Sequence, residues 1–425
     1  MSHNTPSMHN NWKQKMNGLI RASGKYFKTD MVYLARGGFW LTLGQVITAV
    51  SSFLLSIAFA NLVPKTIYGT FRYITSVSST LNAFSLTGVG TALVRSVAKG
   101  YEGALRHGFL LSIRWSALLV FLSFAGAAYY YLRDNITLAV SLLFIGSFSP
   151  FLNASHLATY FANGKKDFKR LSIYNVVKGV LPAILIAGTL FVTENILIIV
   201  FVYFISNSAI AFLTYWNALK FYKPNTEKDP ELLPYSKKLS ALGILSTIAA
   251  HADKILIFTL LGSVELATYA VAVSFPEQIK TMLRNLNFLM IPKFAEKKIS
   301  YRLDIGRKIW QLALLLVVIM VAYMVAAPLL FRIFFPAYND SVSFSIVFAI
   351  SIATSLAMVP NSILIARKHE RELLEINVAG SIIQLLLLFS FIKLWGLWGV
   401  IVSKVIAAYV NLALPFFAIR RHYKL

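Results

Sequence analysis

The 425-residue chain has no cysteine and few acidic residues. Without cysteine it can form no disulfide, thiolate metal site or thiol nucleophile. It also lacks a GxxxxGK[ST] loop for nucleotide phosphates and an HExxH or comparable histidine pair, so neither an ATP-driven pump nor a metal site is predicted. We therefore predict no catalytic residue, no metal and no cofactor, and we expect a protein that is not an enzyme.

The sequence contains long apolar runs without charged residues. Hydrophobic residues make up 57% of the chain, charged residues 14%, and the mean hydropathy is +0.66, which is far too apolar for a soluble domain of this size. A membrane-crossing helix needs about 20 mainly apolar residues. Twelve runs fit, at 38–62, 69–94, 108–132, 136–162, 171–192, 196–219, 239–262, 265–291, 309–331, 341–366, 372–392 and 396–419. The predicted fold is an all-α integral membrane protein with twelve transmembrane helices.

The basic residues alternate between the gaps that separate these runs. Of the 41 Lys and Arg, 30 fall in the N-terminal segment, in every second gap and in the tail 420–425. The opposite gaps are short and hold only Lys65, Arg133, Arg332 and Lys393. Since cytoplasmic loops retain Lys and Arg, both ends of the chain are predicted to be cytoplasmic. The net charge of +24 is thereby explained by membrane topology, and no nucleic-acid partner is expected.

The longest gap, 220–238, divides the runs into six and six. We expect a basic cytoplasmic arm at 1–35, a first lobe at 36–222, a cytoplasmic linker at 223–238 and a second lobe with a short basic tail at 239–425. In transporters such a plan marks two lobes around a central cavity. The turns LVPKTIYGTF (62–71) and LLGSVELATY (260–269) both end in small-Thr-aromatic. This similarity is either a trace of an internal repeat or chance.

Seven cations lie inside the apolar runs, where a charge is costly and must face the bundle interior or a wet cavity. They are Arg72, Arg114, Lys178, Lys254, Lys280, Arg284 and Lys404. Several cations that share a cavity repel one another unless an anion enters, so a phosphate or a carboxylated sugar is the predicted guest. The alternative is that cations near helix ends extend to the lipid headgroups, which suits Arg72 equally well and leaves Arg114 and Arg284 ambiguous.

Only two acids lie clearly within the runs, Asp253 and Glu277. Asp253 should point about 100° away from Lys254 on a helix and so needs a partner on another helix. Glu277, Lys280 and Arg284 recur on one face beside Pro276, either as part of a binding site or as an ion-pair ladder that fixes packing. The two acids are the candidates for coupling to protons or sodium ions.

Three stretches of the chain match a known family. AFANLVPKTIYGTF (58–71), LTGVGTALVRSVA (86–98) and HADKILI (251–257) resemble the polysaccharide-biosynthesis flippases of the Wzx type, which are relatives of lipid II flippases and of MATE drug exporters. The resemblance implies two six-helix lobes around a central cavity in the bacterial inner membrane. It also implies movement of undecaprenyl-diphosphate-linked oligosaccharide units, as in O-antigen and lipopolysaccharide synthesis, from the cytoplasmic to the periplasmic leaflet. Implied partners are membrane lipids, the lipid-linked oligosaccharide and polysaccharide polymerase or assembly proteins.

Two other functions stay open. One is a MATE-like exporter of small organic cations coupled to protons or sodium, and the other is a non-transporting assembly partner or lipid scramblase. A cation exporter needs buried carboxylates, whereas the first six runs contain Arg72, Arg114 and Lys178 and no acid. The sign of the buried charge therefore favours an anionic, lipid-linked cargo.

Overall fold

The computed structural model is helical throughout the part it describes, which is residues 31–284, 304–367 and 369–422. This confirms the prediction of an all-α membrane fold. Most of the predicted arm 1–35 and of the basic gap 292–308 lies outside the described residues. The helices are α2 (Met31–Leu62), α3 (Lys65–Asn82), α4 (Val89–Ala98), α5 (Ala104–Trp115), α6 (Ala117–Tyr131), α7 (Ile136–Ser155), α8 (Leu157–Gly164), α9 (Phe168–Val192), α10 (Ile196–Tyr222), α11 (Leu232–Leu260), α12 (Ser263–Arg284), α14 (Asp304–Phe334), α15 (Ser341–Ala349), α16 (Met358–Ala366) and α17 (Glu370–His422), with 3-10 turns η1 (Pro336–Tyr338) and η2 (Ile350–Ala357).

Within the described residues, nine helical segments are long and apolar enough to cross a membrane. One of them, 371–420, has 50 residues and contains the last two predicted spans. In the predicted spans 69–94 and 265–291 the described helices α3 and α12 do not meet this criterion, because they are rich in Ser, Thr and charged residues. Residues 285–291 lie outside the described part of the chain. The twelve-span count thus remains a prediction, whereas a multi-pass membrane protein is clear.

Several predicted spans are interrupted helices. The second consists of α3 and α4, the third of α5 and α6, the fourth of α7 and α8, and the tenth of α15, η2 and α16. The last two spans run together as α17 and reverse direction at Gly396, where φ is +55° and ψ is −128°. Only glycine adopts such a conformation without strain, so this single residue separates the two spans.

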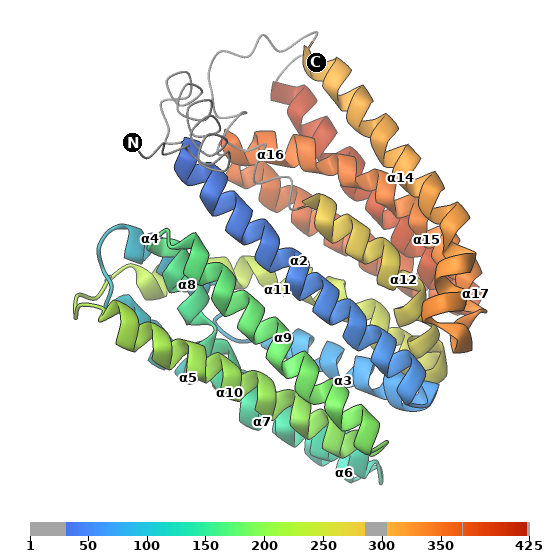
Figure 1. The fold of residues 1–425 in the computed structure, drawn as a ribbon, viewed down its shortest axis with the longest axis horizontal. Coiled ribbons are helices and arrows are strands. Elements are labelled where there is room, and N and C mark those ends of the chain that lie inside the picture. Colours follow the sequence, from blue (N-terminus) through green and yellow to red (C-terminus); the bar gives the residue numbers. More distant parts are fainter. Residues whose placement is uncertain (1–30, 285–303, 368, 423–425) are drawn as a thin grey trace, which may run out of the picture.

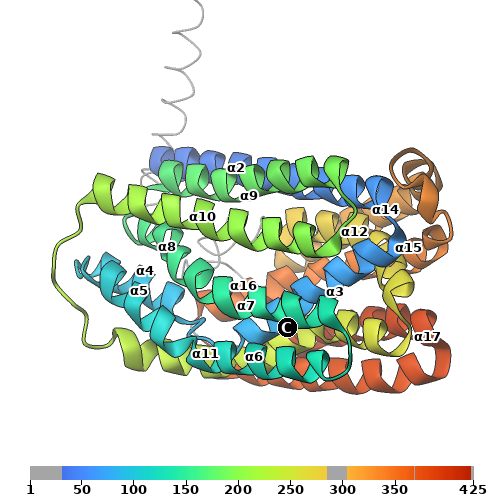
Figure 2. The same ribbon diagram turned by 90° about the horizontal axis from the view of Figure 1, so that it is seen from below.

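The first and second halves of the chain occupy different sides of the molecule. Figure 1 shows α5–α10 gathered on one side and α14–α17 on the other, with α2 and α11 between them. Figure 2, seen from below, shows α2 and α9 side by side along one edge and α11 along the opposite edge. We call α2–α10 the N-half and α11–α17 the C-half.

The two turns with similar sequences pack against each other. Gly69, at the start of α3, lies so close to α12 that a Cβ at this position would be 1.8 Å from the carbonyl oxygen of Ser263. α3 packs extensively against α12. The turn 62–71 and the turn 260–269 therefore meet at the boundary between the halves.

One buried apolar cluster joins both halves at this end of the molecule. It includes Phe59 and Tyr73 from the N-half and Ile257, Phe331 and Val400 from the C-half. We call it the joining cluster. Aromatic contacts reinforce it: the rings of Tyr73 and Phe258 stack with centroids 3.9 Å apart.

At the other end, the described residues form several smaller apolar clusters, and the one in the N-half reaches the C-half only at the start of α11. One is built around α4, α5, α8 and α10 with the first turn of α11. Two others lie within the C-half. The halves do meet there where α4 packs on α11, and the Ser240 hydroxyl accepts a hydrogen bond from the Gly88 N–H (2.9 Å). The molecule is therefore sealed by apolar packing at one end and joined by fewer, more polar contacts at the other.

The segment predicted as a linker is tied to the N-half. α11 begins at Leu232, inside the predicted linker 223–238, because Pro234 in a first helical turn costs no backbone hydrogen bond. The side chain of Asn225 accepts hydrogen bonds from the N–H groups of Glu102 and Gly103, both 3.1 Å. The Asp229 carboxylate accepts one from the Ser96 hydroxyl (2.7 Å). These bonds fasten 225–229 to α4 and to the α4–α5 connection, and we call them the linker latch.

Large apolar side chains cover the outside of the bundle. Trp310 and Val325 on α14 are 76% and 77% exposed, and exposed Phe, Leu and Tyr residues occur on most other helices. A soluble protein would not leave such a continuous apolar surface in water. Lipid covers it in a membrane.

Candidate functional site

A central cavity of about 470 Å³ lies where the N-half meets the C-half. Its walls come from α2 and α3 on one side and from α11, α12, α15 and α17 on the other. Charged residues that line it are Arg72, Asp253, Lys254, Glu277 and Lys404. Sequence reasoning named all five, and the structure brings them together from four helices.

Asp253 is the best-buried acid of this cavity, with 1% of its side chain exposed. One carboxylate oxygen pairs with the Lys404 ammonium at 3.0 Å and also accepts a hydrogen bond from the Tyr269 hydroxyl at 2.6 Å. The other oxygen lies 3.4 Å from the Lys254 ammonium. We call these four residues the Asp253 cluster. Its members come from α11, α12 and α17, so it also ties the C-half together.

The prediction that Asp253 needs a partner on another helix agrees with this arrangement. Lys404 on α17 and Tyr269 on α12 are those partners. The expectation that Lys254 would point away was wrong, because its flexible stem folds back and reaches the neighbouring carboxylate. A buried carboxylate without these contacts would be strongly destabilising, so the two lysines and the tyrosine compensate one charge together.

Arg72 faces the Asp253 cluster from the N-half. It lies in α3 and lines the central cavity, and its Nε is buried with no hydrogen-bond partner in the described part of the chain. A planar guanidinium presents several fixed donors and suits a bidentate oxyanion such as phosphate. The sequence left Arg72 open between a headgroup contact and a cavity residue, and the structure places it in the cavity.

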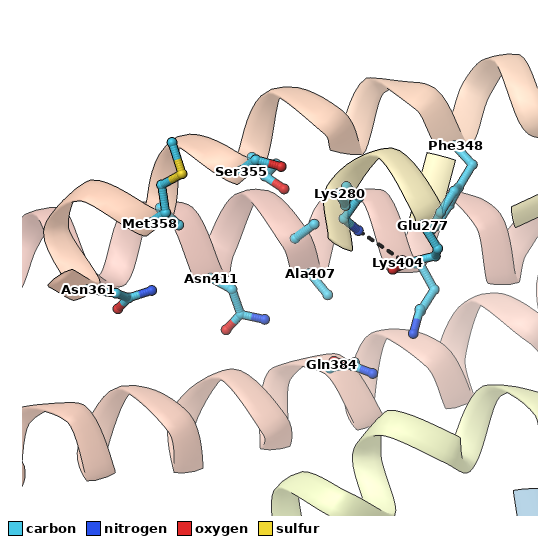
Figure 3. Close-up of a pocket in the computed structure, with 13 residues that line it drawn as sticks. Glu277, Lys280, Phe348, Ser355, Met358, Asn361, Gln384, Lys404, Ala407 and Asn411 are labelled. Carbon is cyan, nitrogen blue, oxygen red and sulfur yellow. Dashed lines mark hydrogen bonds and ion pairs between the residues drawn. The ribbon is translucent and has the colours of Figure 1, made fainter. Parts of the chain in front are cut away.

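Lys280 and Glu277 form an ion pair one turn apart on α12, at 2.9 Å, and the Lys280 ammonium also lies over the Phe348 ring. Figure 3 shows this pair beside Lys404. Four cations, Arg72, Lys254, Lys280 and Lys404, therefore gather around two acids. The formal charge of this region is +2, and that excess would be relieved by an anion.

Three predicted cations are not brought to this region. Lys178 lies within the N-half, where its ammonium donates to the Thr159 hydroxyl at 3.3 Å. Arg114 is exposed on α5. Neither lines the central cavity, and the side chain of Arg284 lies outside the described residues. That these three cations bind substrate stays a prediction, which their described positions do not support.

Some residues of the site escaped sequence reasoning. Tyr269 was noted only as part of a motif, yet its hydroxyl completes the Asp253 cluster. Gln384 on α17 lines the cavity and donates to the Ala249 carbonyl oxygen at 2.7 Å. A buried Asp needs hydrogen-bond donors nearby, so the sequence does indicate that a donor is present. Nothing in the residue spacing identifies which of the many Tyr and Gln residues supplies it.

The structure is similar to solved membrane transporters. One is titled "Lipid II flippase MurJ, inward closed conformation", with 13% identity and a TM-score of 0.67, covering 89% of this chain and 87% of that chain. A second is an inward-facing multidrug resistance MATE family transporter of the MOP superfamily, with 14% identity and a TM-score of 0.66, covering 88% and 94%. A third is a MOP superfamily transporter from Pyrococcus furiosus, with 15% identity and a TM-score of 0.55, covering 91% and 95%.

At such low identity these similarities show the fold alone, which the chain shares with these solved transporters. No curated protein sequence matches the chain. The family model described as "Polysaccharide biosynthesis protein" matches residues 34–296, which is more than half of the chain. The chain belongs to this polysaccharide biosynthesis protein family, and the resemblance seen in its motifs is confirmed.

Proposed function

We propose that this protein is a flippase for lipid-linked oligosaccharides, in which a polyprenyl diphosphate carries the glycan. The observation that supports it most is the gathering of Arg72, Lys254, Lys280 and Lys404 around only two acids. The diphosphate and the glycan enter the central cavity while the polyprenyl tail stays in lipid. Family membership and the fold of a lipid II flippase support the same reading.

The proposed direction of transport is supported by the orientation that the loop charges predict. With the basic gaps in the bacterial cytoplasm, both termini are cytoplasmic and the joining cluster lies at the periplasmic end. The central cavity would then be closed toward the periplasm, as expected before cargo is carried from the cytoplasmic to the periplasmic leaflet of the inner membrane. The two lobes 36–222 and 239–425 would rock about the site, with the linker 223–238 between them.

The MATE-like exporter of organic cations is the second candidate, because exporters of that class share the fold. Such a cargo needs a carboxylate that is available to it. Here Asp253 is held by Lys254, Lys404 and Tyr269, and Glu277 is paired with Lys280. The arrangement of charge therefore favours the anionic cargo.

Coupling to an ion remains part of this proposal only for Glu277. Its side chain is 41% exposed, so it can change its protonation or its partner without unfolding the bundle. The charge of Asp253 is already neutralised by Lys254 and Lys404, and their ammonium groups occupy the positions beside the carboxylate that a sodium ion would need. Transport that survives Glu277→Gln would remove this acid from the coupling mechanism.

Reconstitution into vesicles tests the function directly. A fluorescent polyprenyl-diphosphate oligosaccharide is placed in the membrane, and the fraction that reaches the opposite leaflet is measured with time. Arg72→Gln should lower the initial rate by about tenfold or more, because one charge-assisted contact to phosphate is lost. Arg106→Gln, a matched change on an exposed arginine of α5, should leave the rate unchanged. Equal rates for wild type and Arg72→Gln would refute the cavity model.

A further inference from the structure

A second cavity, of about 380 Å³, adjoins the central cavity and is formed by the C-half alone. Its walls come from α12, α15, η2, α16 and α17. It shares Glu277, Phe348, Gln384 and Lys404 with the central cavity, so the two spaces meet along one wall. We call it the C-half pocket. Its volume lies in the range of small-molecule sites, about 300–1,000 Å³.

The character of the lining changes along this pocket. Near the shared wall it is charged, with Lys404 and the Lys280–Glu277 pair. Farther away it is neutral and polar, with Asn361, Asn411 and Ser355. Figure 3 shows the amides of Asn361 and Asn411 pointing into the open space between α16 and α17.

These neutral groups have no hydrogen-bond partner among the described residues. The Ser355 hydroxyl is buried and unpartnered, and the amides of Asn361 and Asn411 form no hydrogen bond within the described parts of the chain. Each amide offers two donors and an acceptor, and polar groups held in a membrane bundle are costly when left unpaired. They therefore need water or a ligand that carries both donors and acceptors.

The geometry of α17 connects the two regions. Lys404 and Asn411 are seven residues apart, which places them on one face of the helix about 10 Å apart along its axis. Ala407 and Ala408 lie between them and also line the pocket, so small side chains leave the space open. A ligand along this face would meet an ammonium group first and amides next.

We propose that the C-half pocket binds the sugar units nearest the diphosphate, an inference that rests on the proposed flippase function. A sugar ring carries hydroxyl groups that donate and accept, which matches the Asn361 and Asn411 amides and the Ser355 hydroxyl. The order of groups in a lipid-linked sugar, phosphate and then ring, matches the order of Lys404 and Asn411 along α17. Phe348 and Met358 supply the apolar contacts for the C–H face of a ring. The pocket thus selects for a glycan, while the central cavity holds the diphosphate.

Equilibrium binding to the full chain in nanodiscs tests this assignment. The probes are geranylgeranyl diphosphate alone and the same lipid diphosphate carrying glucose, galactose or N-acetylglucosamine. For wild type, at least one sugar-bearing probe should bind about tenfold more tightly than the bare lipid diphosphate, as two added hydrogen bonds provide. The double variant Asn361→Ala/Asn411→Ala should lose this preference and still bind the bare lipid diphosphate as wild type does.

Two controls separate the possible failures. Asn207→Ala, a matched change on α10 whose amide bonds only its own helix at Tyr203, should keep the sugar preference. Arg72→Gln should weaken all four probes alike. The pocket assignment is overturned if no sugar-bearing probe binds better than the bare lipid, or if the preference survives in the double variant. Failure of wild type to bind the bare lipid diphosphate would instead overturn the proposed flippase function.

Discussion

The Asp253 cluster makes a specific prediction about stability. The Asp253 side chain is 1% exposed, and the Lys254 and Lys404 side chains that pair with it are only 17% and 19% exposed. Asp253→Asn keeps the shape of the side chain and removes its charge, leaving two poorly solvated ammonium groups without a counter-charge. Removing one partner of a buried pair costs about 3–5 kcal/mol, so we expect a loss of roughly 4 kcal/mol in the free energy of unfolding.

A second substitution should relieve part of that loss. In Asp253→Asn/Lys404→Met only one buried ammonium group, that of Lys254, is left without the Asp253 counter-charge, in place of two. The double variant should therefore be more stable than Asp253→Asn alone, by about 2 kcal/mol, although it carries one more substitution. Transport should not recover, because Lys404 is also proposed to contact phosphate.

Thermal unfolding in nanodiscs, followed by tryptophan fluorescence, measures both effects. The matched control is Glu277→Gln, because the Glu277 side chain is 41% exposed. Loss of its ion pair with Lys280 should lower the free energy of unfolding by about 1 kcal/mol or less, the value of an exposed pair. The reasoning fails if Asp253→Asn has the same melting temperature as wild type. It also fails if the destabilisation of the double variant equals the sum of those of Asp253→Asn and Lys404→Met measured singly.

Three further outcomes are expected. Gly69→Ala should lower the melting temperature because its Cβ would be 1.8 Å from a backbone oxygen of α12, whereas Gly188→Ala, with no atom within 4 Å, should not. Tyr73→Ala removes the ring stacked on Phe258, so cross-linking or hydrogen exchange should show a more frequently open joining cluster, and unchanged exchange would contradict this. Burial tends to raise the pKa of Asp229, but its hydrogen bonds and neighbouring cations hold that pKa below the usual value. The linker latch is thus intact above the ordinary Asp pKa and weakens as pH falls through the lowered value. In the wild type, proteolysis of the 223–231 segment should therefore accelerate only in acid. In Asp229→Asn it should be fast already at neutral pH.

The sequence predicted the fold class because a long apolar run has few structures available in a bilayer. It also found the charged residues of the site, since an intramembrane charge is rare enough to stand out. It could not predict which of them meet. Lys178 and Lys254 look alike in depth along their helices, but only the second faces the boundary between the halves.

The low hydropathy of α3 and α12 and the presence of the C-half pocket also have physical causes. α3 and α12 carry so many polar residues because they line the cavity and face each other, which lowers their hydropathy. The C-half pocket, and with it the position of Asn361, was not foreseen from the sequence. Its grouping with Asn411 and Ser355 depends on the breaks at η2 and on the path of α17.

The joining cluster has a consequence for temperature. It is built almost wholly from apolar and aromatic side chains, so parting it exposes hydrocarbon to water. Exposure of apolar surface raises the heat capacity, which makes the enthalpy of opening increase with temperature. If parting this cluster limits the turnover rate, an Eyring plot of that rate should be curved rather than straight, and substitutions that shrink the cluster should flatten it.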